Sequence, residues 1–291
     1  MRALILFGLT LVASGSAVNV SVSYHDTIGI PLAERIKTYE EAYFAKVPTN
    51  ERIIGGAVAP ANAHPYFAGL LIDFIGLSLR SVCGSSLVSA NRLVTAAHCW
   101  RDSQRQAWRF EVILGSNSLL NGGFRIYSSN VITHPQYNPF NLNNDIAMIY
   151  LPISVSTTAS IAPINLPQNN ELWQSFEGQL ATAAGFGKTS DQQAGASNIV
   201  SHVNLQVMNL GFCQQIYNQG ASWVVPSTLC TAGWGGVGIC GGDSGGPLVT
   251  NFNGRNILIG VSSFSNLFCE QGLPSGFARV TSFINFINQH L

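Results

Sequence analysis

Three short stretches of the sequence contain residue types that act together in nucleophilic catalysis. Ser244 lies in GICGGDSGGPLV, residues 238–249, where glycines surround it. A serine hydroxyl is a weak nucleophile at its free pKa, so it needs a base within hydrogen-bond reach and a third group that orients the base. His98 in LVTAAHCW and Asp145 in NNDIAMIYL adjoin apolar runs and fit these two roles. Each of them alone also fits a structural role, as a packed histidine or a turn aspartate.

The first residues predict an exported protein. Met1 and Arg2 precede the apolar stretch ALILFGLTLVA and the small residues SGSA, which is the pattern of a signal peptide. We place its end at residue 17. The apolar stretch is too short to span a bilayer well, and no later stretch is long and apolar enough. We therefore expect a secreted, extracellular protein with no membrane partner.

Cysteines and charge narrow the class further. An even number of cysteines in an exported chain predicts disulfides, here three, but the sequence does not choose among the possible pairings. The six are Cys83, Cys99, Cys213, Cys230, Cys240 and Cys269. They show no zinc spacing with each other or with histidine, and the formal net charge is zero. We expect no metal, no cofactor and no nucleic-acid partner.

Two regions of different composition follow the signal. Residues 18–52 contain no cysteine, five acidic residues and two of the three lysines. The sequence NERIIGG then places Arg52 before an apolar pair and two glycines. This junction fits the end of a pro-segment, although an ordinary loop before a strand has the same composition.

From residue 53 onward the chain predicts an all-β domain. Runs of strand length, such as AGLLIDFI, RFEVILG, DIAMIYL and NILIGVSSF, alternate with clusters of Gly, Pro, Asn and Ser. The one convincing helical pattern is the C-terminal VTSFINFINQHL, residues 280–291. Many short strands indicate one or two antiparallel barrels.

The motifs TAAHC, DIAMIYL and GDSGGP, in this order, resemble those of the chymotrypsin/trypsin-like serine endopeptidases. RIIGG, VCGSSLVS and FARVTSFINFI extend the resemblance over residues 53–291. VTSFINFI and Gly238 are similar to insect chymotrypsin-like and collagenase-like digestive proteases. The resemblance implies two packed six-stranded antiparallel β-barrels with a C-terminal helix and an active site between the barrels.

The resemblance also assigns roles to residues. Ser244 would be the nucleophile, His98 its base and Asp145 the orienting acid, and the N–H groups of Gly242 and Ser244 would form the oxyanion hole. Cleavage after Arg52 would free the α-amino group of Ile53, which would pair with Asp243. The disulfides would be Cys83–Cys99, Cys213–Cys230 and Cys240–Cys269.

Substrate preference is expected from the pocket that receives the side chain before the scissile bond. The resemblance places Gly238 at its floor, which argues against Lys or Arg substrates, and places Ser263, Phe264 and Ser265 along one wall. The opposite wall would carry Ser275, or Gly276 if the alignment has a one-residue gap. We expect cleavage after large apolar residues, with elastase-like or collagenolytic cleavage after smaller apolar residues as the alternative.

The expected partners follow from the same family. They are protein or peptide substrates, an activating trypsin-like protease and protein protease inhibitors, and we expect a monomer. A digestive role in a gut lumen is the main hypothesis, because residues 53–291 contain one lysine against eight arginines, and arginine keeps its charge at high pH. An inactive binding homologue and a cascade-processing protease are the alternatives.

Overall fold

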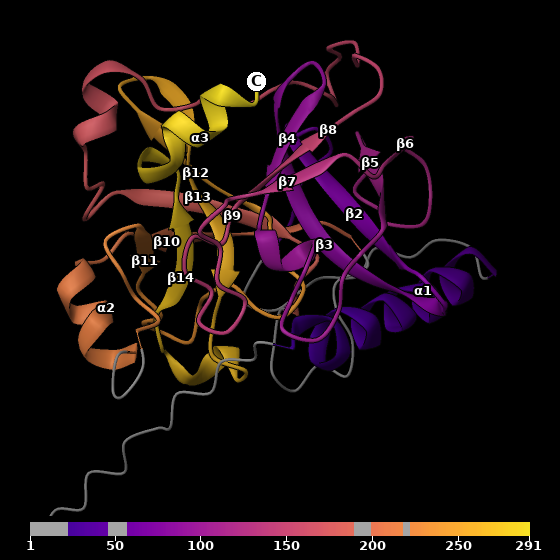
Figure 1. Cartoon of the computed structure of the whole chain (residues 1–291), viewed down its shortest axis with the longest axis horizontal. Coiled ribbons are helices and arrows are strands. Elements are labelled where there is room, and N and C mark those ends of the chain that lie inside the picture. Colours follow the sequence, from indigo (N-terminus) through magenta and orange to yellow (C-terminus); the bar gives the residue numbers. More distant parts are fainter. Residues whose placement is uncertain (1–22, 46–56, 189–198, 218–221) are drawn as a thin grey trace, which may run out of the picture.

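Two curled antiparallel sheets form the body of the protein in the computed structural model (Figure 1). The structure describes residues 23–45, 57–188, 199–217 and 222–291. The expected signal peptide and the Arg52–Ile53 junction lie outside the described residues. The all-β architecture with a C-terminal helix was predicted correctly.

The first sheet holds the strands that carry His98 and Asp145 at their ends. Its order is β6-β5-β2-β3-β4-β8-β7. Its strands are β2 (Phe67–Phe74), β3 (Leu77–Ser89), β4 (Arg92–Thr95), β5 (Arg109–Leu114), β6 (Phe124–Ser128), β7 (Val131–Thr133) and β8 (Ala147–Tyr150). In β2 every residue except Asp73 is buried, so the strand packs on both faces.

The second sheet carries the loop of Ser244 and the expected substrate pocket. Its order is β1-β10-β9-β12-β13-β14-β11. Its strands are β1 (Ala57–Val58), β9 (Leu180–Gly185), β10 (Ser201–Gln206), β11 (Thr228–Thr231), β12 (Pro247–Phe252), β13 (Arg255–Phe264) and β14 (Ser275–Arg279).

Each sheet has seven strands rather than the expected six. In the second sheet the additional strand is the two-residue edge strand β1. In the first sheet β6 and β7 are separated by a short turn, in which the N–H of Asn130 donates to Ser128 Oγ (3.2 Å). After this turn the chain leaves β5 and pairs with β8.

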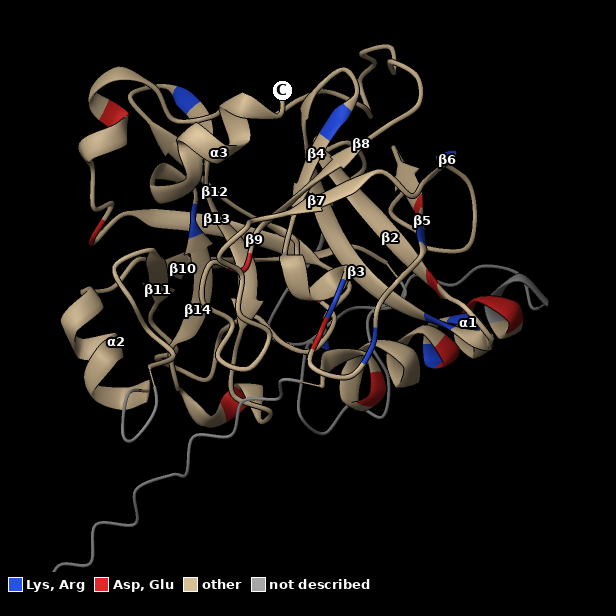
Figure 2. Cartoon of the chain, in the orientation of Figure 1, with Lys and Arg blue, Asp and Glu red and all other residues tan. Residues whose placement is uncertain are grey.

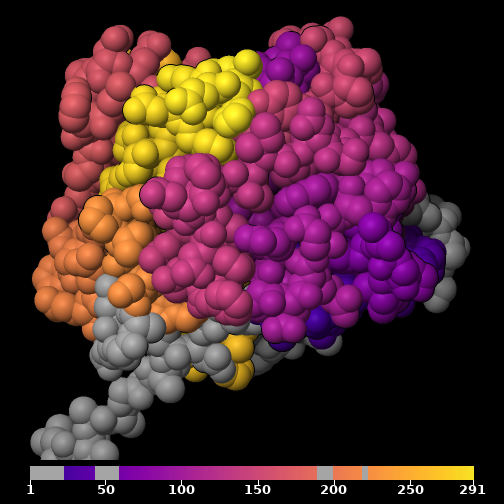
Figure 3. All heavy atoms as spheres, in the orientation of Figure 1, coloured from indigo at the N-terminus to yellow at the C-terminus, as the bar shows by residue number. Residues whose placement is uncertain are grey.

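The C-terminal helix joins the two halves. The residues predicted as one helix form a 3-10 turn over Val280–Phe283 and then α3 (Ile284–Gln289). The carbonyl of His290 accepts from Arg92 Nε (2.9 Å), and its ring lies 2.7 Å from the Tyr150 hydroxyl in the first sheet. The space-filling view shows this yellow segment lying against the magenta first half (Figure 3).

Two helices were not predicted from the sequence. The first is α2 (Leu210–Tyr217), which is too short to show a clear helical period; the Asn209 side chain accepts from the N–H of Gly211 (2.9 Å) at its start. The second is α1 (Ile30–Ala45), which follows a π-helical turn over His25–Gly29 in the expected pro-segment. None of the described helices is long and apolar enough to cross a membrane.

Helix α1 is amphipathic and packs against the body. Pro31 lies in its first turn, where a missing N–H costs little. Leu32, Ile36 and Glu40 recur at every fourth position and are buried. Figure 2 shows charged residues gathered along α1, whereas most of the strands are uncharged. The helix therefore docks through one face, which is apolar except for Glu40.

Candidate active site

His98 and Asp145 are held together by two hydrogen bonds. Strand β4 leads into a 3-10 turn over Ala97–Cys99 that presents the imidazole, and Asp145 lies two residues before β8. His98 Nδ1 lies 2.7 Å from Asp145 Oδ2, and the backbone N–H of His98 donates to Asp145 Oδ1 (2.8 Å). With Nδ1 donating to the carboxylate, Nε2 is left as the proton acceptor.

Asp145 has a further donor. The hydroxyl of Ser263 donates to Asp145 Oδ2 at 2.6 Å. The side chain of Asp145 is almost fully buried, and these donors replace the water that it loses. Ser263, expected only as a pocket wall, therefore also holds Asp145 in place beside His98.

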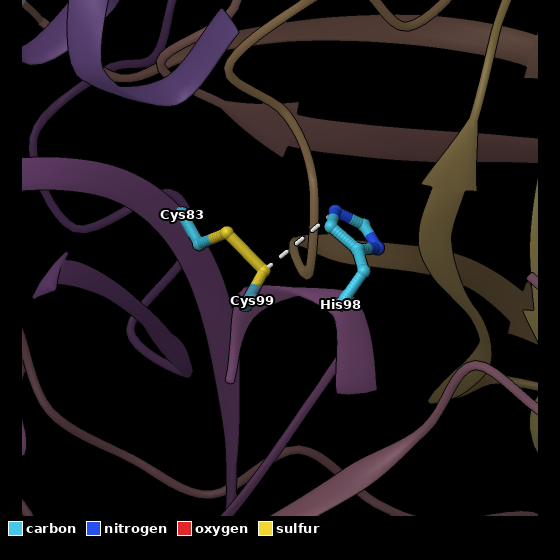
Figure 4. A group of neighbouring side chains, drawn as sticks. All are labelled: Cys83, His98 and Cys99. Atoms are coloured by element: carbon cyan, nitrogen blue, oxygen red, sulfur yellow. Dashed lines mark hydrogen bonds between the residues drawn. A yellow bond between two sulfur atoms is a disulfide. The ribbon is translucent and has the colours of Figure 1, made fainter. Parts of the chain in front are cut away.

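A disulfide lies beside His98. Cys83 and Cys99 are bonded at 2.06 Å, and Cys99 Sγ lies 3.9 Å from His98 Nε2 (Figure 4). These three side chains are close enough to hold a metal ion, but both sulfurs belong to the disulfide, so neither is a free thiolate ligand. The other two disulfides join Cys213 to Cys230 and Cys240 to Cys269, as the resemblance implied.

Backbone contacts fix the loop of Ser244 against the first sheet. The carbonyl of Ser244 accepts from the N–H of Gly84 (2.7 Å), and the N–H of Gly245 donates to Ser262 (2.8 Å). Gly245 has φ of 77°, and a Cβ there would collide with the carbonyl of Gly84. Ser244 and His98 line the same cavity, so the two sheets bring the predicted nucleophile and the predicted base together.

Asp243 points away from this cavity into the second sheet. Its carboxylate accepts from the N–H groups of Cys240 (2.9 Å) and Gly187 (2.8 Å). Burial raises its pKa to about 6, against a lowering by these two donors. Among the described residues, no Lys, Arg or His forms an ion pair with it. The expected partner Ile53 lies outside the described residues.

The expected substrate pocket lies beside Ser244. Ser263, Phe264 and Ser265 line the cavity, together with Ile239. No carboxylate appears among its described lining residues, and Glu270 is exposed on the turn over Cys269–Gln271.

The opposite wall depends on the register of β14. Ser275 Oγ accepts from the N–H of Ile239 (3.1 Å) and lies 2.9 Å from the position that a Cβ on Gly238 would take. Gly276 instead pairs with Phe264 and lies beneath its ring. Of the two residues left open by the sequence, Ser275 is the one that points toward Gly238.

The same cavity contains residues that the sequence did not place there. Tyr24, Ile28 and Leu32 from the expected pro-segment line it. The Tyr24 ring lies edge-on to the His98 ring at 4.8 Å between centroids, and its hydroxyl donates to the carbonyl of Val82 (2.7 Å). The apolar period of Leu32 and Ile36 was the available signal for the helix, but it does not say where the helix docks.

Comparison with known proteins places the site in context. The family model described as Trypsin matches residues 53–287. The chain is 38% identical over 240 residues to Collagenase of Hypoderma lineatum, covering 82% of this chain and 87% of that protein. It is 36% identical over 239 residues to Brachyurin of Leptuca pugilator, covering 81% and 96%. The solved structure of HL collagenase matches with a TM-score of 0.73 at 38% identity, covering 82% of this chain and 98% of that one.

Proposed function

The chain belongs to the trypsin family and is a chymotrypsin-like serine endopeptidase, and on this premise we propose that it is a secreted zymogen that cleaves after apolar residues. In this proposal residues 1–17 are the signal peptide, 18–52 the activation segment and 53–291 the protease domain. The observation that carries it is one cavity that joins Ser244 to the His98–Asp145 pair and has no carboxylate among its described lining residues.

Each group of this cavity has a chemical role in the proposal. Ser244 attacks the scissile carbonyl while His98 Nε2 takes its proton and later gives it to the leaving amine. Asp145 keeps the imidazole in the required tautomer and stabilises its cation. The N–H groups of Gly242 and Ser244 stabilise the oxyanion, and Gly242 has φ of 110°, a conformation that few other residues adopt.

Activation uses the partly buried carboxylate of Asp243. Cleavage after Arg52 creates the α-amino cation of Ile53, which enters the second sheet and pairs with Asp243. The raised pKa supports this step, because a carboxylate in this position is stabilised by a cation that the uncut chain lacks among its described residues. The turn through Gly242 then holds its N–H groups toward the substrate.

The pocket supports apolar rather than basic substrates. A Lys or Arg side chain would have no carboxylate to pair with among the described lining residues. We propose large apolar side chains such as Leu, Met or Phe as the main substrates. The position of Ser275 beside Gly238 narrows the pocket and favours the second candidate, elastase-like or collagenolytic cleavage after smaller residues, as do the names of the relatives in Hypoderma and Leptuca.

The disulfides and the expected signal peptide fit an oxidising, extracellular compartment. We propose a digestive role, activation by a trypsin-like protease and inhibition by protein inhibitors. The intact triad residues argue against an inactive binding homologue, and the lack of cysteine in residues 18–52 argues against the regulatory module of a cascade protease.

One experiment tests the proposal. The purified full chain is treated with immobilised trypsin, the new N-terminus is sequenced, and cleavage of a mixed peptide library is profiled. We expect Ile53 as the N-terminus and cleavage after apolar residues. A chain that is cut at Arg52 but inactive would overturn the enzyme assignment, and cleavage mainly after Lys or Arg would overturn the pocket assignment. A Ser244→Ala variant controls for residual trypsin.

A further inference from the structure

Helix α1 and the turn before it cover the catalytic groups themselves. Tyr24 packs its ring against the His98 ring and donates its hydroxyl to the carbonyl of Val82, and it is 4% exposed. Burial raises its pKa, and a hydrogen bond with the Ser244 side chain acts in the opposite direction. A substrate carbonyl that approaches Ser244 beside His98 would meet the Tyr24 ring.

The next two turns cover the oxyanion hole. The side chain of Ile28 packs on Gly241, so that a Cβ there would lie 2.8 Å from Ile28 Cγ2. One turn later the side chain of Leu32 packs on Gly242. The segment therefore covers the nucleophile, the base and the turn that would hold the oxyanion.

Polar anchors hold both ends of the segment. At its start, the N–H of His25 donates to Asp102 (2.8 Å), and Asp26 forms an ion pair with Arg105. Near its other end, the buried carboxylate of Glu40 accepts from the N–H groups of Leu119 (3.1 Å) and Leu120 (3.1 Å) and from the side chain of Asn121. A carboxylate bonded in this way is specific to one docked position.

Between the anchors, helix α1 buries an apolar face. Leu32, Ala33 and Ile36 share one cluster with residues of both sheets, namely Phe67, Leu71, Val82, Ala184 and Phe186. Gly29 fits closely, because a Cβ there would collide with the Ser81 hydroxyl. Apolar burial on this scale stabilises a complex as well as an intramolecular contact.

The docked backbone is not presented as a substrate. A protease site cleaves a peptide bond whose carbonyl reaches the nucleophile, but residues 25–29 form a π-helical turn and residues 30–45 an α-helix. Their backbone groups are engaged in the helix rather than offered to the site. Residues 18–52 also contain no cysteine, so no disulfide would keep the segment attached after cleavage at Arg52.

We propose that residues 23–42 are an inhibitor of the catalytic site, and that as a separate peptide this segment binds the activated protease domain and blocks it reversibly. The proposal rests on the proposed function, because release of the segment requires cleavage after Arg52. While attached, the segment acts at the high effective concentration of a tether; after cleavage and dilution it dissociates. The uncut chain is then latent in two ways, through an Asp243 that forms no ion pair among the described residues and through the covered Ser244.

The test uses a synthetic peptide of residues 18–46 and the activated protease domain, freed of its own segment and of trypsin. The peptide is made separately because Arg35 and Lys37 are exposed trypsin sites. We expect competitive inhibition of a short apolar substrate. Tyr24→Ala and Glu40→Gln peptides should inhibit roughly tenfold more weakly or worse, as for central interface residues. Glu41→Gln is the matched control for Glu40→Gln on the exposed side of the helix and should inhibit like the parent peptide.

The outcomes separate this inference from the proposed function. An active enzyme that the peptide neither inhibits nor binds would overturn the inference and leave the function standing, as would rapid cleavage of the peptide as an ordinary substrate. Equal loss in the control and test variants would overturn the docked position. An inactive protease domain would overturn the proposed function, while calorimetric binding of the peptide to the activated Ser244→Ala protein would still report on the inference.

Discussion

The carboxylate of Asp145 contacts His98 twice, through the ring Nδ1 at 2.7 Å and through the backbone N–H at 2.8 Å. These two bonds set both the position and the tautomer of the imidazole. An asparagine at position 145 has the same shape but would present an N–H donor to His98 Nδ1. It should therefore prevent His98 from accepting a proton at Nε2 without moving the ring.

Asp145→Asn is predicted to lower kcat by roughly 10⁴-fold in the activated enzyme, because an amide donor facing Nδ1 would leave the proton on Nε2. Ser263→Ala removes only one of the donors to Asp145 and should lower kcat by about tenfold. Steady-state kinetics on one peptide substrate measure both, and thermal melts control for folding. An Asp145→Asn enzyme within tenfold of the parent would contradict the assigned role.

Asp243 predicts a pH-dependent stability of the uncut chain. Its pKa is raised from 3.8 to about 6, so the folded state favours the protonated carboxyl. The stabilisation of the folded state by this protonation is fully present below about pH 3.8 and is lost as the pH rises through 6. Asp243→Asn removes this loss. The uncut variant should melt at a higher temperature than the parent at about pH 8, with the difference shrinking toward about pH 4.

The exposed Glu41→Gln is the control for Asp243→Asn and should show no such difference. After cleavage at Arg52, Asp243→Asn should be less stable than the parent, because the Ile53 cation then lacks the carboxylate with which it is proposed to pair. The cleaved Asp243→Asn protein should have roughly 10²-fold lower kcat/KM than the parent. A fully active cleaved variant would show that Asp243 is not the partner of the new N-terminus.

Roles for single residues were easier to predict than the surfaces around them. His98, Asp145 and Ser244 lie in short motifs whose order is characteristic, so the sequence predicted a catalytic role for each, and the family implied the disulfides. The choice between Ser275 and Gly276 could not be made, since it depends on the strand register that pairs Gly276 with Phe264. A one-residue shift would have reversed which side chain faces Gly238.

The larger omission from the sequence analysis was helix α1 of the expected pro-segment and its docking on the body. Its composition distinguished it from the domain, but composition carries no information on docking. The spacing of Leu32, Ile36 and Glu40 indicates a helix with one buried face only when the buried role of Glu40 is known. A carboxylate is usually exposed, so the sequence alone would have placed Glu40 on the solvent side of the helix.

Ser275→Gly is predicted to widen the substrate pocket. Removing the hydroxymethyl group beside Gly238 should raise kcat/KM for Phe and Tyr relative to Ala and Leu by roughly tenfold. A panel of peptides that differ only in the residue before the scissile bond measures the ratio. Ser265→Gly tests the other wall in the same assay. If the Phe-to-Ala ratio stays unchanged in Ser275→Gly, Ser275 does not limit the pocket.

His25 predicts that the pro-segment binds more weakly in acid. Its ring is fully buried, Nδ1 lies 2.9 Å from Ser81 Oγ, and the Phe74 ring makes a T-shaped contact with it. Burial lowers its pKa to about 4, while Asp102 and Asp26 act to raise it and His98 and Arg105 to lower it. Because the pKa of a free histidine is about 6.5, docking releases a proton below that pH.

The affinity of the peptide should therefore be constant above about pH 6.5 and fall roughly tenfold by about pH 5.5. Calorimetry with the activated Ser244→Ala protein measures it without cleavage. The profile of the parent peptide is compared with that of a His25→Gln peptide on the same protein. The difference in affinity between the two peptides at each pH is due to His25. If this difference does not change with pH, His25 is not buried in the bound state.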